Sequence, residues 1–336
     1  MFSMAPANSS GCRSDDWYLT GSTVEFFSKK TNFDFLGKRK PAFLLSGLLM
    51  VGSLILLIPG VRGLNFGIDF TGGVLVELGY KDSANLSDIR ERLAANGFAD
   101  AQVQNFGTSS DVLIRVLPRE GLAGATVGNQ ILDVLKAGDA SAELRRTEFV
   151  GPQVGEDLSE QGGLAMLFAL IMILVYIVVR FQWKFAVGAI IATLHDPIIT
   201  LGFFALLGLT FDLSVLAAML AIVGYSVNDT IVVFDRIREN FRKIRRGTPQ
   251  DIMNLSVNET LSRTIMTSLA TALVVIAMLL FGGETLRGFS TALIIGILVG
   301  TYSSIFVASA LALELKATPV DLMPPVKSKA ELDSQP

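Results

Sequence analysis

The sequence predicts a membrane protein: an all-α bundle of six transmembrane helices with an α+β domain inserted between the first two helices. Three observations predict this fold class. Hydrophobic residues make up 51% of the 336 residues, and they gather in blocks of about 20, the length that crosses a hydrocarbon core about 30 Å thick. Lysine and arginine gather in alternate connections between these blocks. One connection alone, residues 60–162, is long enough to form a domain.

Six blocks have the length and composition of membrane spans. They are apolar around their whole circumference, unlike an amphipathic surface helix, and a helix satisfies every backbone hydrogen bond inside lipid. The expected spans are 41–59, 163–180, 185–207, 213–234, 265–281 and 289–313. The chain then divides into an N-terminal tail (1–40), a first helix (41–59), an inserted domain (60–162), helices two to six (163–313) with a basic loop (235–263), and a C-terminal tail (314–336).

The distribution of positive charge sets the orientation of the spans. Lysine and arginine lie before the first span, between the second and third, between the fourth and fifth, and after the sixth. The connections 208–212 and 282–288 together contain one basic residue, Arg287. Because positively charged loops stay on the cytoplasmic side, we expect both tails in the cytoplasm and residues 60–162 outside it.

The inserted segment has the pattern of a small α/β domain. Residues 74–80 alternate as a strand does, and residues 85–96 are typical of a helix with Asn85 as its N-cap. A hairpin (101–106 and 111–117), a second helix (125–136) and a last strand (143–150) follow. The order βαββαβ fits a ferredoxin-like split βαβ unit in the periplasm. The alternative is a loosely structured loop.

Ionisable residues inside a membrane span are costly and are candidates for function. The third span carries His195, Asp196 and Pro197 at its middle, and His195 is the only histidine of the chain. Pro197 has no backbone N–H and is expected to kink this helix. The alternative interpretation is that His195 only pairs with Asp196 or a neighbouring carbonyl. No metal site is expected, because no cluster of further ligands accompanies one histidine.

The fourth span carries a second candidate, Asp229, with Asn228 beside it. A carboxylate inside a span takes up a proton or binds a cation, and proton relays are built from such groups. Arg263, just before the fifth span, is the expected cationic partner within the chain. Two alternatives stay open: the two residues form a purely structural ion pair, or Arg263 is an ordinary positive charge at the cytoplasmic boundary.

Two further patterns concern helix packing. After the fourth span, one face carries Phe234, Ile237, Phe241 and Ile244 opposite arginines, which predicts a basic amphipathic helix at the membrane surface. The alternative is that this helix docks a partner. Thr248 then opens the next helix as an N-cap, with Asp251 three residues on. Small residues recur at every fourth position of the sixth span, which predicts a seam for close packing: Ala292, Gly296, Gly300, Ser304 and Ala308.

No pattern in the sequence predicts catalysis or a cofactor. There is no nucleophilic serine or cysteine arrangement, no Walker loop and no dinucleotide fingerprint. The glycine-rich segment 67–73 lacks the lysine and the helix that a phosphate loop needs. A net charge of −3 gives no reason to expect nucleic acid, and the single Cys12 cannot form an internal disulfide. We therefore expect neither an enzyme nor a nucleic-acid partner.

Several motifs together resemble one known family. GIDFTGG at 67–73 looks like the signature of the SecD and SecF proteins; its motif residues are Gly67, Asp69, Phe70, Gly72 and Gly73. GYSVNDTIVVFDRIREN at 224–240 resembles the SecF branch, as do VGPQVG at 150–155 and LSRTIMTS at 261–268. The resemblance covers about residues 33–313. Pro197 departs from it, because the family usually has an apolar residue there.

The resemblance implies a subunit of the resistance-nodulation-division superfamily in the bacterial inner membrane. Such a subunit pairs with SecD, associates with the SecYEG channel and YajC, and uses the proton-motive force to assist late steps of protein translocation. Its external domain holds the translocating polypeptide. Asp229 matches the family's proton-path aspartate and Arg263 the matching arginine, and coupling by sodium stays open. The alternatives are a small-molecule efflux transporter, which would need twelve spans, and a passive scaffold.

Overall fold

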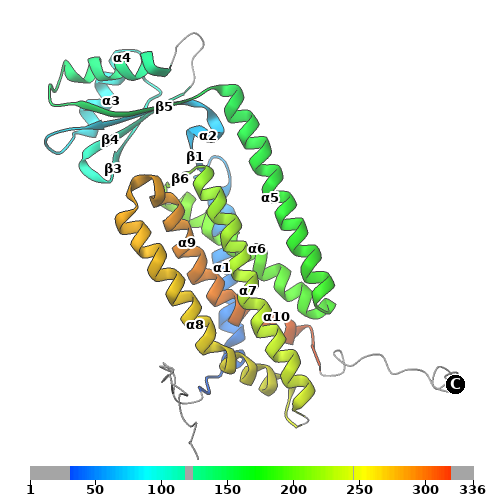
Figure 1. The fold of residues 1–336 in the computed structure, drawn as a ribbon. Helices are drawn as coiled ribbons and strands as arrows, with labels where there is room; N and C mark the ends of the chain where they lie inside the picture. The colour runs from blue at the N-terminus through cyan, green and yellow to red at the C-terminus, as the bar shows by residue number, and fades with distance from the viewer. Residues whose placement is uncertain (1–30, 118–123, 245, 319–336) are drawn as a thin grey trace, which may run out of the picture.

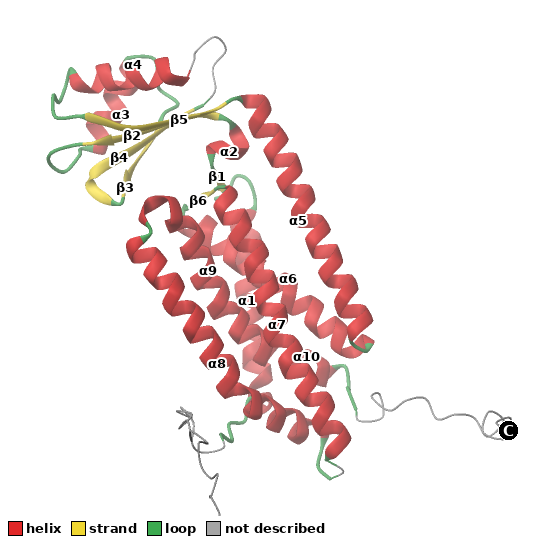
Figure 2. Ribbon diagram, viewed as in Figure 1, coloured by secondary structure: helices red, strands yellow, loops and turns green. Residues whose placement is uncertain are grey.

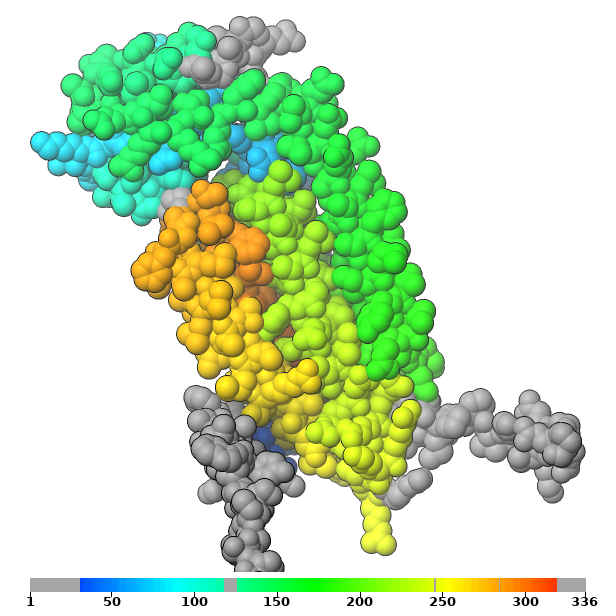
Figure 3. All heavy atoms as spheres, in the orientation of Figure 1, coloured from blue at the N-terminus to red at the C-terminus, as the bar shows by residue number. Residues whose placement is uncertain are grey.

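The computed structural model describes residues 31–117, 124–244 and 246–318. Much of the expected tails, 1–40 and 314–336, including Cys12, therefore lies outside the described residues. The described part is a bundle of long helices with an α+β domain at one end (Figure 1). Among these residues, six helical segments are long and apolar enough to cross a membrane. Figure 3 shows the domain seated on one end of the bundle.

The long helices run along one common direction (Figure 2). α1 (Arg39–Leu57) follows a 3-10 turn at Leu36–Lys38. α9 (Gly283–Ser303) continues through a π turn (Ser304–Ala308) into α10 (Ser309–Glu314). The other four are α5 (Pro152–Arg180), α6 (Trp183–Leu207), α7 (Leu213–Lys243) and α8 (Pro249–Phe281). α7 packs against α6, α8 and α9 and so lies at the centre of the bundle.

Two helices begin well before the apolar blocks that predicted them. α5 begins at Pro152 and α8 at Pro249, in place of residues 163 and 265. A proline at the first turn costs no hydrogen bond, so a helix can start there outside the lipid. The expected cap of α8 is confirmed. Thr248 Oγ1 accepts from Asp251 N at 3.2 Å, and Asp251 Oδ2 accepts from Thr248 N at 3.0 Å.

The amphipathic surface helix expected after the fourth span is wrong. α7 runs without a break from Leu213 to Lys243. Phe234, Ile237 and Phe241 are buried in the bundle core, where Phe234 packs edge-on against Phe185 at 5.1 Å between ring centroids. The apolar face that indicated a surface helix is a core face, because α7 and α8 pack together beyond the apolar part of each span.

The segment between α1 and α5 folds as an α+β domain. Its elements are β2 (Gly73–Gly79), α3 (Leu86–Ala95), β3 (Gln102–Phe106), β4 (Thr108–Val116), α4 (Gly124–Lys136) and β5 (Glu143–Val150). The sheet order is β3-β4-β2-β5, with antiparallel neighbours throughout. α3 and α4 cover one face of this sheet (Figure 2), so the opposite face is left toward the bundle.

The domain has a closed core, so it is not a loose loop. Alternate residues of β2, Val74, Val76 and Leu78, are buried with Ile114 of β4 under the two helices. The expected N-cap of α3 is confirmed: Asn85 Oδ1 accepts from the backbone N–H groups of the first turn at 3.1 and 3.4 Å. The side chains between the buried ones, such as Glu77, point to the open face.

Candidate functional site: a polar cluster in the bundle and a junction at its end

A cluster of polar side chains lies inside the bundle where α6, α7 and α9 meet. We call His195, Asp196, Ser226 and Ser303 the polar cluster. Asp196 is 0% exposed, and its Oδ1 lies 2.8 Å from His195 Nδ1. Its Oδ2 accepts from Ser303 Oγ at 2.8 Å and from Ser226 Oγ. Three partners on three helices therefore satisfy one buried carboxylate.

Small residues of α9 allow this close approach. A Cβ added at Gly300 would lie 3.2 Å from Ser226 Cβ and 3.4 Å from Asp196 Oδ2. A Cβ added at Gly296 would lie 2.3 Å from the side chain of Ile222. The expected small-residue seam thus brings α9 against α7 at the level of the cluster. α6 continues as a helix through Pro197, with Thr200 Oγ1 donating to the Asp196 carbonyl at 2.8 Å.

A second polar contact, beside the polar cluster, joins α7, α8 and α9. Tyr225 of α7 donates to Ser268 Oγ of α8 at 3.1 Å, and Ser268 Oγ lies 2.8 Å from Thr301 Oγ1 of α9. Asn240 Nδ2, near the far end of α7, donates to Ser256 Oγ of α8 at 2.9 Å. These pairs fix an antiparallel register between α7 and α8 that sets Asp229 opposite the buried Thr264.

Asp229 is buried on α7, but the expected ion pair with Arg263 is not formed. Its side chain is 3% exposed, and its Oδ2 has no hydrogen-bond partner within the described chain. No nitrogen of Arg263 lies within 4.0 Å of it among the described contacts, and Arg263 and Asn228 are both exposed. The Arg263 guanidinium is nevertheless the charge that acts on the Asp229 carboxyl, so the expected cation is near Asp229 without a direct ion pair.

The glycine-rich motif at 67–73 forms a junction between the domain and the bundle. β1 (Asn65–Phe66) pairs in parallel with β6 (Thr210–Phe211), in the loop between α6 and α7. Gly67 N donates to the Phe211 carbonyl at 2.7 Å. In the short helix α2 (Ile68–Thr71), Asp69 Oδ2 accepts from Leu213 N at 3.0 Å. The motif thus binds the first residue of α7.

Each of the other motif residues has a packing role at the junction. Phe70 stacks on Phe211, with ring centroids 5.6 Å apart and an angle of 23°. Gly72 and Gly73 have φ values of 66° and 122°, which favour glycine. A Cβ at Gly73 would lie 2.4 Å from the Val116 carbonyl oxygen. Gly155 of α5 packs on the same turn, since its Cβ would lie 2.7 Å from Gly72 N.

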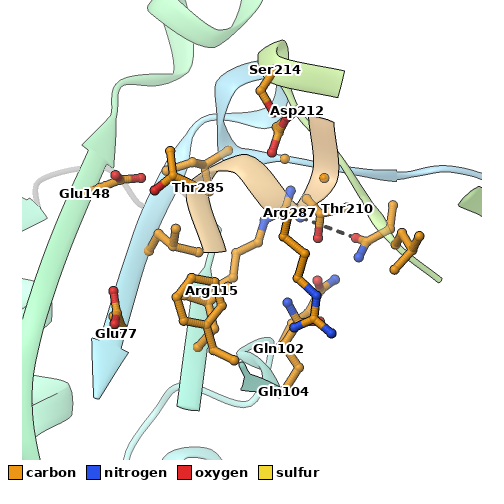
Figure 4. Close-up of a pocket in the computed structure, with 18 of the residues that line it drawn as sticks. Glu77, Gln102, Gln104, Arg115, Glu148, Thr210, Asp212, Ser214, Thr285 and Arg287 are labelled. Atoms are coloured by element: carbon orange, nitrogen blue, oxygen red, sulfur yellow. Dashed lines mark hydrogen bonds between the residues drawn. The ribbon is translucent and has the colours of Figure 1, made fainter. Parts of the chain in front are cut away.

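A cavity of about 510 Å³ lies between the open face of the sheet and the end of the bundle. Figure 4 shows Glu77, Gln102 and Arg115 of the sheet facing Thr285 and Arg287 of α9. Arg115 Nη2 donates to Thr71 Oγ1 of the junction at 2.7 Å, and burial lowers the pKa of the Arg115 guanidinium. The cavity walls carry both signs of charge.

Comparison with known proteins gives consistent matches along the chain. The family model described as protein export membrane protein SecD/SecF, C-terminal, matches residues 130–318, and the SecD/SecF GG motif matches residues 58–84. The protein translocase subunit SecF of Vibrio alginolyticus is 53% identical over 305 residues, covering 90% of this chain and 96% of the relative. The SecF of Escherichia coli O157:H7 is 47% identical over 285 residues, covering 84% of this chain and 88% of the relative. The chain belongs to the SecF family.

Solved structures of SecDF agree with this assignment. The crystal structure of the translocon-associated SecDF from Thermus thermophilus is 38% identical with a TM-score of 0.76, over 85% of this chain and 39% of that chain. SecDF in the super-membrane-facing form has 38% identity and a TM-score of 0.62, over 86% of this chain and 39% of that chain. This SecF chain therefore spans about two fifths of the solved SecDF chains. The matched GG motif is the junction described above.

Sequence reasoning missed three residues of the site: Ser226, Ser303, and Phe211, on which Phe70 stacks. Ser226 carried a usable signal, because it lies three residues before Asp229 and so shares its side of α7. Ser303 and Phe211 carried none, because the residues that they contact are distant in sequence. Among the described residues, no group of three His, Cys, Asp or Glu side chains that could hold a metal ion converges.

Proposed function

We propose that this chain assists protein export by coupling the proton-motive force to late steps of translocation through the SecYEG channel, in complex with SecD. We place it in the bacterial inner membrane with both termini in the cytoplasm and residues 60–162 in the periplasm. Its membership of the SecF family supports the export role. The asymmetric distribution of lysine and arginine supports the orientation.

The observation that carries the proposal is the environment of Asp229. An ionised carboxylate inside a membrane is costly unless it is paired, yet Asp229 Oδ2 has no partner in the described part of the chain. A carboxyl group held in this way can bind and release a proton. We include the exposed Asn228 and Arg263 in the proton path, because they border this position from α7 and α8.

α7 offers a route from the proton site to the external domain. Asp229 and Ser226 lie one turn apart on α7, and Ser226 bonds to Asp196 of α6. The first residue of the same helix, Leu213, is held by Asp69 of the junction. A shift or rotation of α7 on protonation is therefore passed to the junction, and from there to the sheet through Arg115 and Thr71.

We propose that the external domain is a ferredoxin-like periplasmic domain that contacts the translocating polypeptide. The sheet order supports this topology. When β2, β3, β4 and β5 are counted as strands 1 to 4, they lie in the order 2-3-1-4 across the sheet. A ferredoxin-like βαββαβ unit has this order when its sheet is followed from the edge formed by strand 2. The cavity beside Gln102, Arg115 and Arg287 has polar groups of both signs, and such a surface accepts chains of varied sequence.

We propose SecD as the direct partner, with SecYEG and YajC as further components. In their most apolar stretch, α5 and α8 bury only a small share of their residues in this chain, whereas α6 and α7 bury about half of theirs. Phe168 and Met172 of α5, for example, are exposed. The solved SecDF chains are longer and hold a region beyond the part matched here. In our proposal, SecD supplies the corresponding region and covers part of this apolar surface.

Asp229→Asn tests the proposal, because it keeps the size of the side chain and removes the titrating group. In proteoliposomes that hold the assembled complex, we expect the variant to lose most of the proton-dependent stimulation of export. Asp235→Asn is the matched control, since Asp235 lies on the same helix in a half-exposed pair with Arg180 and such pairs contribute little. Full stimulation by an assembled Asp229→Asn complex would contradict the proposal and favour a passive scaffold.

A further inference from the structure

The buried imidazole of His195 has one nitrogen with a partner and one without. The side chain is 2% exposed. Its Nδ1 lies 2.8 Å from Asp196 Oδ1, whereas its Nε2 has no hydrogen-bond partner among the described residues. Buried polar atoms of this kind are uncommon in folded proteins and call for a specific reason.

The chemistry of the pair determines which nitrogen can exchange a proton. An ionised carboxylate only accepts hydrogen bonds, so the bond to Asp196 places the proton of a neutral ring on Nδ1. Nε2 then carries the free lone pair. Histidine is also the side chain whose charge changes most readily near neutral pH. His195 Nε2 is therefore a basic atom inside the bundle with nothing bonded to it in the described chain.

We propose that His195 and Asp196 form a second proton-exchange site of the bundle, distinct from Asp229, which controls the hydrogen bonds that tie α6 to α7 and α9. The inference deepens the proposed function and rests on it for the source of the protons. In the neutral ring, Nδ1–H donates to the Asp196 carboxylate and the pair has a net charge of −1. A proton added to Nε2 gives an imidazolium beside a carboxylate, and the pair becomes neutral.

Protonation alters what the cluster needs from its surroundings. Nε2 changes from an acceptor to a donor that must find an acceptor, because a buried N–H without a partner is unfavourable. At the same time the imidazolium attracts Asp196 more strongly, in competition with Ser226 and Ser303 for its oxygens. Both changes act on the bonds that cross from α6 to the two neighbouring helices.

The groups around the pair come from three neighbouring helices. α7 presents Ser226, with Asp229 about one turn further along, and α9 presents Ser303. The titratable hydroxyl next to Ser303, that of Tyr302, is turned to α1, where it donates to the Ala42 carbonyl at 2.8 Å and accepts from Ser46 at 3.1 Å. The nearest charges of α5 and α10 lie at the far end of the bundle in ion pairs, Arg180 with Asp235 and Glu314 with Arg39.

The packing around Ser303 makes α9 responsive to these bonds. Ser303 is the last residue of α9 before the π turn at Ser304–Ala308, and a π turn within an α-helix is often found at functional positions. The π turn packs on α6, where a Cβ at Gly188 would lie 2.7 Å from the Ala308 carbonyl. Loss of the bond from Ser303 to Asp196 therefore frees α9 next to its least regular turn.

Nitrogen-15 NMR of the histidine ring tests the proposal directly, because His195 is the only histidine of the chain. The assembled complex is prepared with ¹⁵N-histidine in this chain alone and with a tag that contains no histidine. We expect a single pair of ring signals in which Nδ1 carries a proton, and in which Nε2 changes from unprotonated to protonated as the pH is lowered over the range in which the complex stays assembled. Asp196→Asn should change the pH of that transition.

Two variants separate the proton site from a merely structural role. Ser303→Ala removes a bond to Asp196 and should also change the pH of the transition. Ser304→Ala is the matched control and should leave it unchanged, because Ser304 is equally buried but bonds to the Thr301 carbonyl of its own helix. Ring signals that stay in one form over this pH range overturn the proposal, and so does equal behaviour of the two serine variants. The NMR readout does not depend on export. A result that contradicts the role of Asp229 therefore leaves the proposal for His195 and Asp196 intact.

Discussion

At the scale of single residues, the two buried aspartates of the bundle differ in how their charge is supported. Asp196 accepts from three side chains on three helices. Asp229 has an oxygen without a partner in the described chain. A carboxylate with several donors is well supported in a buried site, whereas one without them needs a proton or a conformational change. The structure thus separates a carboxylate whose negative charge is supported by its donors from one that has reason to take up a proton itself.

The last glycine of the family motif, Gly73, offers a residue-scale prediction. Gly73→Ala should destabilise the junction by roughly 1–3 kcal/mol, the usual range for a strained backbone residue. Its φ of 122° disfavours any side chain, and the added Cβ would meet the Val116 carbonyl at 2.4 Å. Hydrogen exchange of the β2 amides measures the loss as a smaller free energy of local opening.

Gly97→Ala is the control for this substitution. Gly97 also has a positive φ, 89°, but no heavy atom lies within 4 Å of the position that its added Cβ would occupy. The difference between the two variants therefore isolates the clash with Val116 from the backbone preference. Equal protection of β2 in both variants would show that the close approach at Gly73 contributes nothing.

At the scale of elements, α7 connects the parts of the molecule that matter for coupling. It is held at its first residue by Asp69, near its middle by the polar cluster, and near its end by the contact of Asn240 with Ser256. These three contacts lie on one unbroken helix of 31 residues, so a displacement at the polar cluster can reach both ends of α7. The junction is the place where this displacement reaches the external domain.

Asp69→Ala should loosen the start of α7 by about 1 kcal/mol, the usual effect of losing a helix cap. The carboxylate accepts from Leu213 N at 3.0 Å, and Asp212 caps only Val215 N of the same turn, at 2.9 Å. Hydrogen exchange at the Leu213 amide should speed up several-fold, while the middle of α7 is unchanged. Asp82→Ala, at an exposed position outside the junction, is the control. Unchanged exchange at Leu213 would mean that Asp69 does not hold α7.

The elements also show which features of the fold could be predicted from the sequence and which could not. The spans and the order of strands and helices in the domain could be predicted, because hydropathy, alternation and caps are local. The starts of α5 and α8 could not, since hydropathy detects only the part of a helix that suits lipid. The polar cluster depends on Ser226 and Ser303, which meet Asp196 only after three helices pack. The sequence identified Arg263 as the charge that acts on Asp229, but it could not predict that the two side chains make no direct contact, because the rotation of α8 against α7 decides that.

At the scale of the whole molecule, most basic residues of the bundle lie at the end far from the external domain. Arg39, Arg180 and Lys184 lie at or beside helix ends far from the domain, together with the basic end of α7. The end that bears the domain contributes Arg62, from the connection after α1, and Arg287, from the start of α9. Basic residues inside the folded domain do not change the expected orientation, because long external segments cross the membrane largely regardless of their charge.

Cysteine labelling tests the orientation that follows from this separation. In a Cys12→Ser background the chain has no other cysteine, so one new thiol reports one position. Ala140→Cys, in the domain, and Arg242→Cys, at the far end of α7, are both exposed sites. We expect a membrane-impermeant maleimide to label Ala140→Cys in spheroplasts and to label Arg242→Cys only after the membrane is opened. The Cys12→Ser parent should stay unlabelled throughout. The reverse pattern would put the domain in the cytoplasm, where it could not contact a polypeptide leaving the channel, and would contradict the proposed role in late translocation.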